Sequence, residues 1–404
     1  MKRRFTRRDL LSGMILAAGG LALAAARRAF GSLAGGAAAQ NSQAAQAPSV
    51  TLTPQVYLPQ VQRHWPWTSP VIHVHAPGAV TWDFTAGWYG DYVQQGVVDE
   101  MVRVGLCKLT ETSSVADAWP VLIPNYQPGQ KIAVKVNLNN ASCSDTDNSI
   151  DADIETVNAL IGSLIESGVN ESDVWVYDAQ RPMPARFYNR RTYKNARYFD
   201  NAGCADEQAP FNHIDPSLRV TFTNPALVLQ RWLTDLLFQA TYLINVPLLK
   251  KHGLHPVTLG FKNHFGSLSS LGGSGNDNPH FYINPGDSRY QATSSPLVDI
   301  NANPHVAGKT VLILADGLLG AHTVSAAPMP WETFGGEPPQ SLLLSRDPVA
   351  MDCVLCDLLR AEWGVEAAAY DYLKVAEKRG LGLFERGEPW GSGYSRISYL
   401  RVRI

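Results

Sequence analysis

The fold follows from one stretch, Ile154-Glu-Thr-Val-Asn-Ala-Leu-Ile-Gly-Ser-Leu-Ile-Glu-Ser167, which leads through Gly168 into Val174-Trp-Val-Tyr177. Apolar residues in the first segment recur at i, i+3, i+4 and i+7, the spacing that predicts an amphipathic helix. The second segment has no strict alternation of polar and apolar residues, which indicates a strand buried on both faces. A helix that leads into such a strand is the repeating unit of a parallel α/β sheet.

The same two patterns recur along the chain. Further strands are expected at Lys131–Leu138, Arg219–Thr223, Thr241–Val246, Thr310–Leu314 and Gln340–Leu344. Further helices are expected at Tyr92–Leu106, Val257–Phe265, Asp347–Trp363 and Ala367–Arg379. The closing segment Ile397–Ile404 is expected to be an edge strand, and Gly272–Pro296 a long loop. We therefore predict an α/β domain over residues 71–404, with a largely parallel or mixed sheet and helices on both faces.

The N-terminus carries the pattern of a twin-arginine export signal, Thr6-Arg7-Arg8-Asp9-Leu10-Leu11, and an apolar run follows to Ala26. Small residues up to Ala39 predict cleavage there by a signal peptidase. We expect residues 1–39 to be the signal peptide and the polar residues 40–70 to be a disordered stalk. A retained anchor is the alternative, since the apolar run of ~17 residues is at the short edge of what spans a bilayer.

This leader predicts partners and a location. The twin-arginine translocase carries proteins that have already folded, commonly because they hold a cofactor or fold fast. The protein is therefore expected in the periplasm, outside the cell or at the cell surface, with membrane contact only through an uncleaved signal.

Composition narrows the class of partner. A formal net charge of −2 and the lack of a basic stripe interleaved with aromatic residues give no reason to expect nucleic acid. Five Cys are too few for a disulfide scaffold, although an oxidising compartment permits disulfides. Cys353 and Cys356 lie one helical turn apart and are expected to pack in the core, because no second Cys pair completes a tetrahedral metal site.

Lysine, histidine and asparagine residues are concentrated just after the strand expected at Thr241–Val246. Lys250, His252 and His255 follow this strand directly, and the helical segment beyond it carries Lys262, Asn263 and His264. Ligands of parallel α/β sheets collect at the carboxyl ends of strands, and lysines beside exposed backbone N–H groups suit a phosphate or carboxylate. We therefore predict a small anionic ligand here.

A second segment, Lys131–Asn140, places Lys135 inside an apolar strand and Asn137 where that strand ends. An unpaired ammonium would be costly there, so Lys135 must meet either a ligand or a structural carboxylate. Asp178 and Asp316 also follow strands, where acids act as active-site carboxylates or cap the next helix.

Histidines leave a metal open as an alternative. Neutral imidazoles bind zinc, copper, nickel or iron, and His252, His255 and His264 are the candidate ligands. His73 and His75 share one face of an upstream strand and are a weaker pair. No His-Glu-x-x-His segment is present, and the nucleophile elbow and the phosphate-binding glycine loops are missing as well.

Five segments together resemble the uncharacterised family called domain of unknown function 362. They are Ile132–Leu138, Leu243–Lys250, Lys251-His252-Gly253, Gly260-Phe-Lys-Asn-His-Phe-Gly266 and Arg346–Asp352. The resemblance covers roughly residues 120–380 and implies a fold and a site but no reaction. Lys251 directly precedes His252, a small departure in spacing. Some relatives look like iron–sulfur proteins, but this chain lacks their run of four Cys, so that cofactor is not expected.

Two functions are consistent with these observations. The first is an enzyme acting on a small anionic substrate, and the second is a non-catalytic protein that captures an anion or a metal. The residues expected to bind the anion are Lys135, Asn137, Lys250, Lys262 and Asn263. The residues expected to transfer protons or balance charge in an enzyme are His252, His264, Asp178 and Asp316.

Overall fold

The computed structural model describes residues 69–228, 230–273 and 275–404 of the chain. The expected signal peptide and nearly all of the expected stalk lie outside the described residues. Ser69 and Pro70, the last two residues assigned to that stalk, already belong to the first strand, β1 (Ser69–His75). Within the described ranges, no helix is both long enough and apolar enough to cross a membrane.

Ten strands of the described chain pair into one mixed sheet. Besides β1, they are β2 (Lys131–Lys135), β3 (Val174–Tyr177), β4 (Arg197–Asp200), β5 (Glu207–Gln208), β8 (Ala240–Asn245), β9 (Leu248–Lys250), β10 (Thr310–Ala321), β11 (Ser341–Ser345) and β12 (Ile397–Arg403). Their order is β12-β1-β11-β10-β8-β2-β3-β4-β5, and β9 pairs with β10. The strands from β10 to β5 are parallel, β11 is antiparallel to both neighbours, and β12 is parallel to β1.

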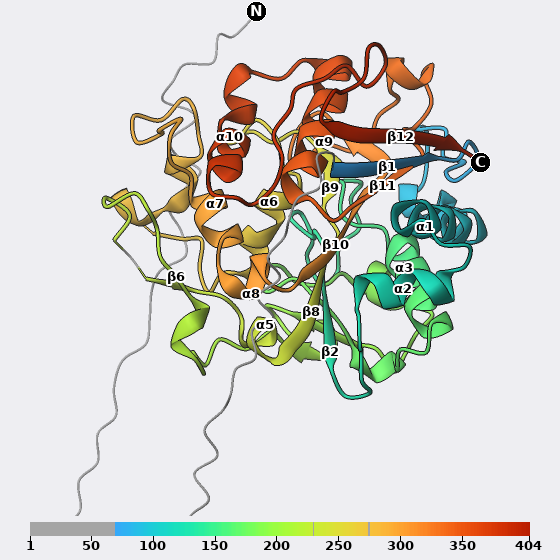
Figure 1. Ribbon diagram of the computed structural model, residues 1–404, viewed down its shortest axis with the longest axis horizontal. Helices are drawn as coiled ribbons and strands as arrows, with labels where there is room; N and C mark the ends of the chain where they lie inside the picture. Colours follow the sequence, from blue (N-terminus) through green and yellow to red (C-terminus); the bar gives the residue numbers. More distant parts are fainter. Residues whose placement is uncertain (1–68, 229, 274) are drawn as a thin grey trace, which may run out of the picture. The chain divides into compact units, whose positions relative to one another are not determined.

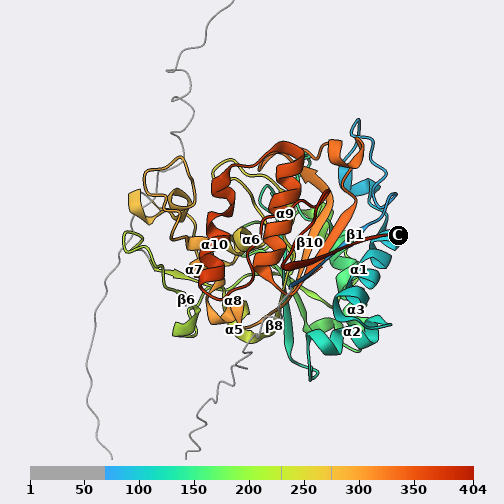
Figure 2. The same ribbon diagram turned by 45° about the horizontal axis from the view of Figure 1, so that its top comes forward.

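Helices cover both faces of this sheet, as Figures 1 and 2 show. One layer consists of α1 (Gln95–Thr110), α2 (Val115–Leu122) and α3 (Ile154–Glu166). The opposite layer contains α5 (Asp235–Gln239), α6 (Gly260–Asn263), α7 (Pro296–Asn301), α8 (Pro304–Ala307), α9 (Pro348–Trp363) and α10 (Asp371–Lys378). A further short helix, α4 (Ala185–Tyr188), lies between β3 and β4. The predicted α/β class, with a mixed sheet and helices on both faces, is confirmed.

Alternate residues of the strands supply two separate cores. Val134 of β2 and Val176 of β3 pack with apolar residues of α1, α2 and α3. Ala133 of β2 and Tyr177 of β3 pack with those of α6, α9 and α10. Because successive side chains of a strand point to opposite faces, strands covered on both sides must be apolar throughout. This is why these strands lack strict alternation.

Two predicted elements differ from the structure. The strand expected at Arg219–Thr223 is reduced to β6 (Arg219–Val220), which pairs with β7 (Arg231–Trp232) in a separate ribbon. The helix expected at Val257–Phe265 contains only the single turn of α6, followed by a 3-10 turn at His264–Ser267. The cause is long-range: the chain turns sharply at Leu259, whose φ is 40°, to bring the backbone of α6 against α9.

Candidate anion site at the strand ends

The order of the strands creates a crevice between β2 and β8. From β2 the chain proceeds outward through β3, β4 and β5, whereas β8 lies on the other side of β2. The two strands are parallel, and Lys135 at the end of β2 is paired with Asn245 at the end of β8. Connections that leave neighbouring parallel strands in opposite directions open a crevice at their carboxyl ends, where ligands of α/β proteins bind. We call the group formed there by Lys135, Asn137, Asp178, Lys262 and Asn263 the strand-end site.

Lys135 is fully buried and its ammonium group is already engaged. Its Nζ lies 2.9 Å from Asp178 Oδ2 and 3.2 Å from Asn263 Oδ1, and it also donates to the carbonyl of Val136. Burial lowers the pKa of Lys135, and the neighbouring Asp178 carboxylate acts in the opposite direction. Of the two partners open to Lys135 from the sequence, the structure provides the carboxylate. Lys135 therefore has a structural role in the site, because its ammonium group is bound by Asp178 and Asn263.

Asn263 connects the elements around this ion pair. Its side-chain Nδ2 donates to Asn245 Oδ1 over 2.7 Å and to the carbonyl oxygens of Lys135 and Val246 over 3.3 Å. Its Oδ1 accepts from Asn137 Nδ2 over 3.2 Å. Every polar atom of the Asn263 side chain is hydrogen-bonded, whereas Asn137 Oδ1 is buried without a partner among the described residues. Asn263 thus holds β2, β8 and α6 in register at the strand ends.

Asp352 of α9 fixes the start of α6, a role that the sequence analysis did not assign. Its carboxylate accepts from the backbone N–H groups of Gly260 and Phe261 at 2.8 and 3.0 Å, and from Tyr372 Oη at 2.9 Å. Burial raises the pKa of Asp352 to about 6, and these hydrogen bonds oppose that rise. The signal available in the sequence was the acidic residue that closes the segment Arg346–Asp352.

A small cavity of about 40 Å³ opens above the asparagine network. Asn137, Thr258, Lys262 and His280 contribute to its lining, together with the exposed Arg181. Lys262 is only 8% exposed, and its side chain makes no hydrogen bond or ion pair with any described residue; its Nζ lies 5.3 Å from the centroid of the Phe265 ring. Arg181 and His280 were not predicted as site residues, because neither stands in a recognisable pattern of sequence.

Positive charge accumulates around this cavity. Burial, followed by repulsion from Lys250 and Arg181, lowers the pKa of Lys262 to about 7. Burial also lowers the pKa of Lys250 to about 8, although Asp151 opposes that shift. A buried ammonium without a counter-ion is unfavourable, because a low-dielectric interior penalises charge. A bound anion would compensate this positive charge and lower its energetic cost.

A family model described as a domain of unknown function (DUF362) matches residues 132–357. The chain belongs to this family. A comparison of the chain with curated proteins finds no match. The matched segment contains every member of the strand-end site as well as Asp352, so this arrangement lies within the DUF362 domain.

Lys250 and Asp316, also within the DUF362 domain, lie on the α3 side of the sheet and do not line the cavity. Lys250 Nζ donates to the carbonyl oxygens of Ile150 and Val324 at 3.1 and 3.4 Å. Asp316 accepts from the backbone N–H of Asp153, at the N-terminus of α3, over 3.2 Å. Burial raises the pKa of Asp316 to about 6. Asp316 therefore contacts the N-cap of α3, whereas Lys250 contacts the loops at Ile150 and Val324 and influences the cavity through its charge.

The three predicted histidines are held by their own neighbours. His252 Nδ1 accepts from the backbone N–H of Leu254 at 3.1 Å, His255 Nδ1 lies 2.7 Å from the carbonyl of Val257, and His264 Nδ1 lies 3.2 Å from Ser267 Oγ. Burial lowers the pKa of each imidazole well below its usual value. Within residues 69–228, 230–273 and 275–404, no three His, Cys, Asp or Glu side chains form a group that could hold a metal ion. The geometry therefore lends the metal prediction no support.

A disulfide between Cys143 and Cys204 joins the loop after β2 to the loop after β4, with a Cα–Cα distance of 5.6 Å. Cys107, Cys353 and Cys356 are free, and the last two are buried as the sequence analysis expected. The DUF362 domain thus carries a covalent link across the loops that border the strand-end site.

Proposed function

We propose that this protein binds a small anion at the strand-end site, outside the cytoplasm. The observation that carries the proposal is Lys262, a buried lysine that lines the cavity and whose side chain has no hydrogen bond or ion pair with any described residue. Proteins retain such a group where a ligand supplies the missing partner, since the group destabilises the empty protein. Arg181 at the rim and Lys250 beneath add to the attraction for an anion.

The size and the polar lining of the cavity limit the class of ligand. A volume of about 40 Å³ holds roughly three water molecules, which is room for a carboxylate or phosphate group. The amides of Asn137 and Asn139 and the hydroxyl of Thr258 lie in the lining and can donate hydrogen bonds to anionic oxygens. The proposed ligand is therefore a free small anion or the anionic end of a larger molecule.

Export by the twin-arginine route is part of the proposal. It is supported by Arg7 and Arg8 in the leader and by the disulfide between Cys143 and Cys204. Disulfides persist in oxidising compartments and are rare in the cytosol. A protein that meets an oxidant after or during folding would gain this link, and the cytosolic form would lack it.

Catalysis is the second candidate function, and Lys262 favours it. With a pKa of about 7, half of its side chains carry a neutral amine near neutral pH. A neutral amine beside a bound anion can accept a proton or attack a carbonyl group. In this enzyme, Lys262 rather than His252 or His264 would be the proton-transfer group.

Isothermal titration calorimetry with phosphate, sulfate and acetate tests the binding proposal. Each titration is run at pH 7.5 in two buffers of different ionisation enthalpy. We expect binding coupled to proton uptake, because an anion beside Lys262 raises its pKa. Lys262→Met should lose both the binding and the uptake, whereas Lys194→Met, at an exposed lysine, should retain them. The proposal fails if wild type binds none of the three anions up to about 10 mM, a free energy near −2.7 kcal/mol, or if Lys262→Met binds them equally.

The catalytic candidate has its own test with pyruvate, a small carboxylate that carries a ketone. Lys262 would add to the ketone and lose water to give an imine, which cyanoborohydride reduces to a stable secondary amine. Peptide mapping that finds this adduct on Lys262, and not on Lys194, supports an enzyme with a nucleophilic lysine. Binding of acetate without any adduct from pyruvate supports a binding protein.

A further inference from the structure

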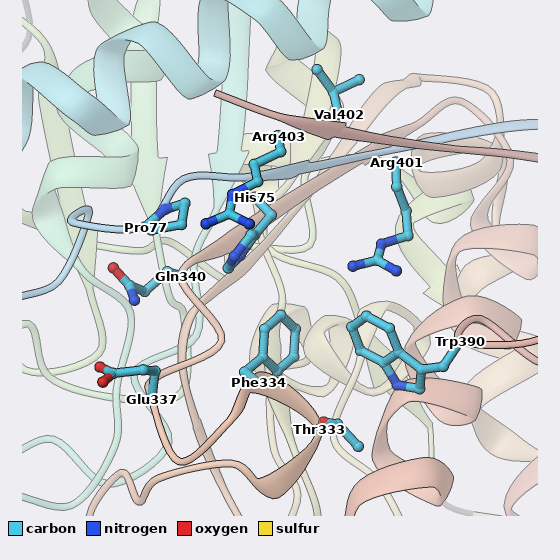
Figure 3. A pocket seen from close by; sticks show the side chains of 10 residues that line it. All are labelled: His75, Pro77, Thr333, Phe334, Glu337, Gln340, Trp390, Arg401, Val402 and Arg403. Carbon is cyan, nitrogen blue, oxygen red and sulfur yellow. The ribbon is translucent and has the colours of Figure 1, made fainter.

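A second cleft lies at the far end of the sheet, where β1 and β12 end side by side (Figure 3). Its volume is about 460 Å³, which is within the range of small-molecule sites. His75, Phe334, Trp390, Arg401 and Arg403 form its working surface. None of them belongs to the strand-end site, and both strands lie outside the segment matched to the DUF362 family. The cleft is thus a separate feature of this chain.

The register of the two strands concentrates positive charge in this cleft. Parallel pairing sets Arg401 opposite His73 and Arg403 opposite His75. Arg401 and Arg403 are two residues apart, so both side chains leave the same face of β12, and Figure 3 shows both directed into the cleft. Both guanidinium groups therefore face the cleft from the end of one strand, and burial lowers the pKa of His73 and His75 on the paired strand.

No carboxylate of the described chain neutralises these arginines. The side chains of Arg401 and Arg403 make no hydrogen bond or ion pair with any described residue, and Glu337, which also lines the cleft, pairs with neither. The Arg401 guanidinium lies 4.2 Å from the centroid of the Trp390 ring, which orients it toward the cleft. Two oriented guanidinium groups with unused donors are suited to a carboxylate or phosphate group, which they can bind through paired hydrogen bonds.

Aromatic rings lie beside these arginines in the lining. The Phe334 ring lies 5.0 Å from Trp390 at 87° and 5.3 Å from His75, measured between centroids. The indole Nε1 of Trp390 is buried and has no hydrogen-bond partner among the described residues. These rings offer faces and edges for a flat ring to pack against. The cleft therefore places cationic groups and aromatic rings next to one another in one lining.

We propose that this cleft binds a small aromatic anion, with its carboxylate or phosphate group between Arg401 and Arg403 and its ring against Phe334 and Trp390. The proposal does not depend on the function of the strand-end site. It gives the His73-Val-His75 segment a role in shaping a cationic cleft, since His73 bonds to Tyr399 and Ser341 and His75 packs on Phe334.

The test is calorimetric titration of the full-length exported protein with phenyl phosphate and, separately, with benzoate. Arg401→Gln and Arg403→Gln should each weaken binding of the probe by roughly tenfold or more, because each removes a charged hydrogen-bond donor. Arg386→Gln is the matched control, since Arg386 is an exposed arginine stacked 4.4 Å above the Tyr370 ring outside the cleft. It should leave the affinity unchanged.

Two further comparisons locate the probe and define its chemistry. In the Lys262→Met background, which lacks binding at the strand-end site, phenyl phosphate should still bind, and Arg401→Gln should still weaken that binding; this result separates the cleft from the strand-end site. Inorganic phosphate should bind at the cleft more weakly than phenyl phosphate, since it lacks the ring. The proposal is overturned if neither aromatic probe binds up to about 10 mM, or if the double variant Arg401→Gln, Arg403→Gln binds them as tightly as wild type.

Discussion

Replacing Gly266 with alanine should damage the strand-end site from within. A Cβ atom on Gly266 would lie 2.5 Å from Lys135 Nζ and 2.8 Å from Asp178 Oδ1. An ordinary van der Waals contact begins near 3.4 Å, so the ammonium would have to retreat by about 0.9 Å. The end of a lysine side chain normally yields at little cost. Here it cannot, because Lys135 is fixed by its contacts with Asp178 and Asn263.

The expected loss of unfolding free energy is about 2 to 3 kcal/mol. Overpacking of a filled interior costs roughly 1 to 3 kcal/mol, and a weakened charged hydrogen bond costs roughly 1.5 to 3 kcal/mol. These costs overlap, because the same movement of the ammonium relieves the first and causes the second. Replacing glycine by alanine also stabilises the folded protein by roughly 0.4 to 1 kcal/mol, because it lowers the conformational entropy of the unfolded chain. This gain offsets part of the two costs and leaves the net loss at the value given above.

Urea unfolding of wild type, Gly266→Ala and Gly253→Ala measures this difference. Gly253 is the matched control, since it lies in the segment between β9 and α6 and a Cβ there would have nothing within 4 Å. We expect a lower midpoint with an unchanged slope for Gly266→Ala, and a midpoint at or slightly above that of wild type for Gly253→Ala. If the two variants unfold within about 0.5 kcal/mol of each other, the ion pair is not packed as described.

Two other predictions concern charge and the disulfide. Because the pKa of Lys262 falls from 10.5 to about 7 on folding, the folded chain binds fewer protons in that window and wild type should gain stability as the pH rises through it. Lys262→Met should thus be more stable than wild type at pH 7, by roughly 1 to 3 kcal/mol of unfolding free energy, and this difference should narrow toward pH 10. Lys309→Met is the comparison variant and should be less stable than wild type, since Lys309 donates hydrogen bonds to three backbone carbonyls. Urea midpoints at both pH values decide this, and a destabilised Lys262→Met would contradict it. Replacing Cys143 and Cys204 by serine should cost about 4 kcal/mol, given the sequence separation of 61, and should abolish the effect of a reductant on unfolding; an unchanged midpoint would mean that the bond does not form.

The layered fold could be predicted because its signals are local. The helix at Ile154–Ser167 and the strand beside it were expected almost at the bounds of α3 and β3, since apolar spacing alone defines them. The edge strand at the C-terminus was also expected, and β12 confirms it. The order of the strands was not predicted. That β12 pairs with β1, and that β11 is inserted antiparallel, depends on contacts between residues more than 250 positions apart.

Part of the candidate site could also be predicted from local signals in the sequence. Lys135 and Asp178 each stand at a strand end, and the parallel sheet brings them together as that position suggests. Asp316 was expected just after a strand, but β10 continues to Ala321, so Asp316 lies within the strand and its side chain leaves the opposite face of the sheet. Alternate residues of a strand face opposite sides of the sheet, so a shift of one residue in the predicted start of a strand moves a side chain to the other face. The role of Arg181 depends on a loop conformation that no periodic pattern encodes.

The pairing of the first described strand with the last has a consequence for the timing of biogenesis. The strand partners of β1 among the described residues are β11 and β12, so the ribosome must add more than 250 residues before β1 can pair with either of them. At roughly 5 to 20 residues per second, the 334 positions from Ser69 to Arg403 take roughly 20 to 70 s. For most of that interval the apolar strand β1 is unpaired and open to aggregation. An export route that accepts only folded proteins would therefore act on this chain only after its C-terminal strand has paired and completed the sheet.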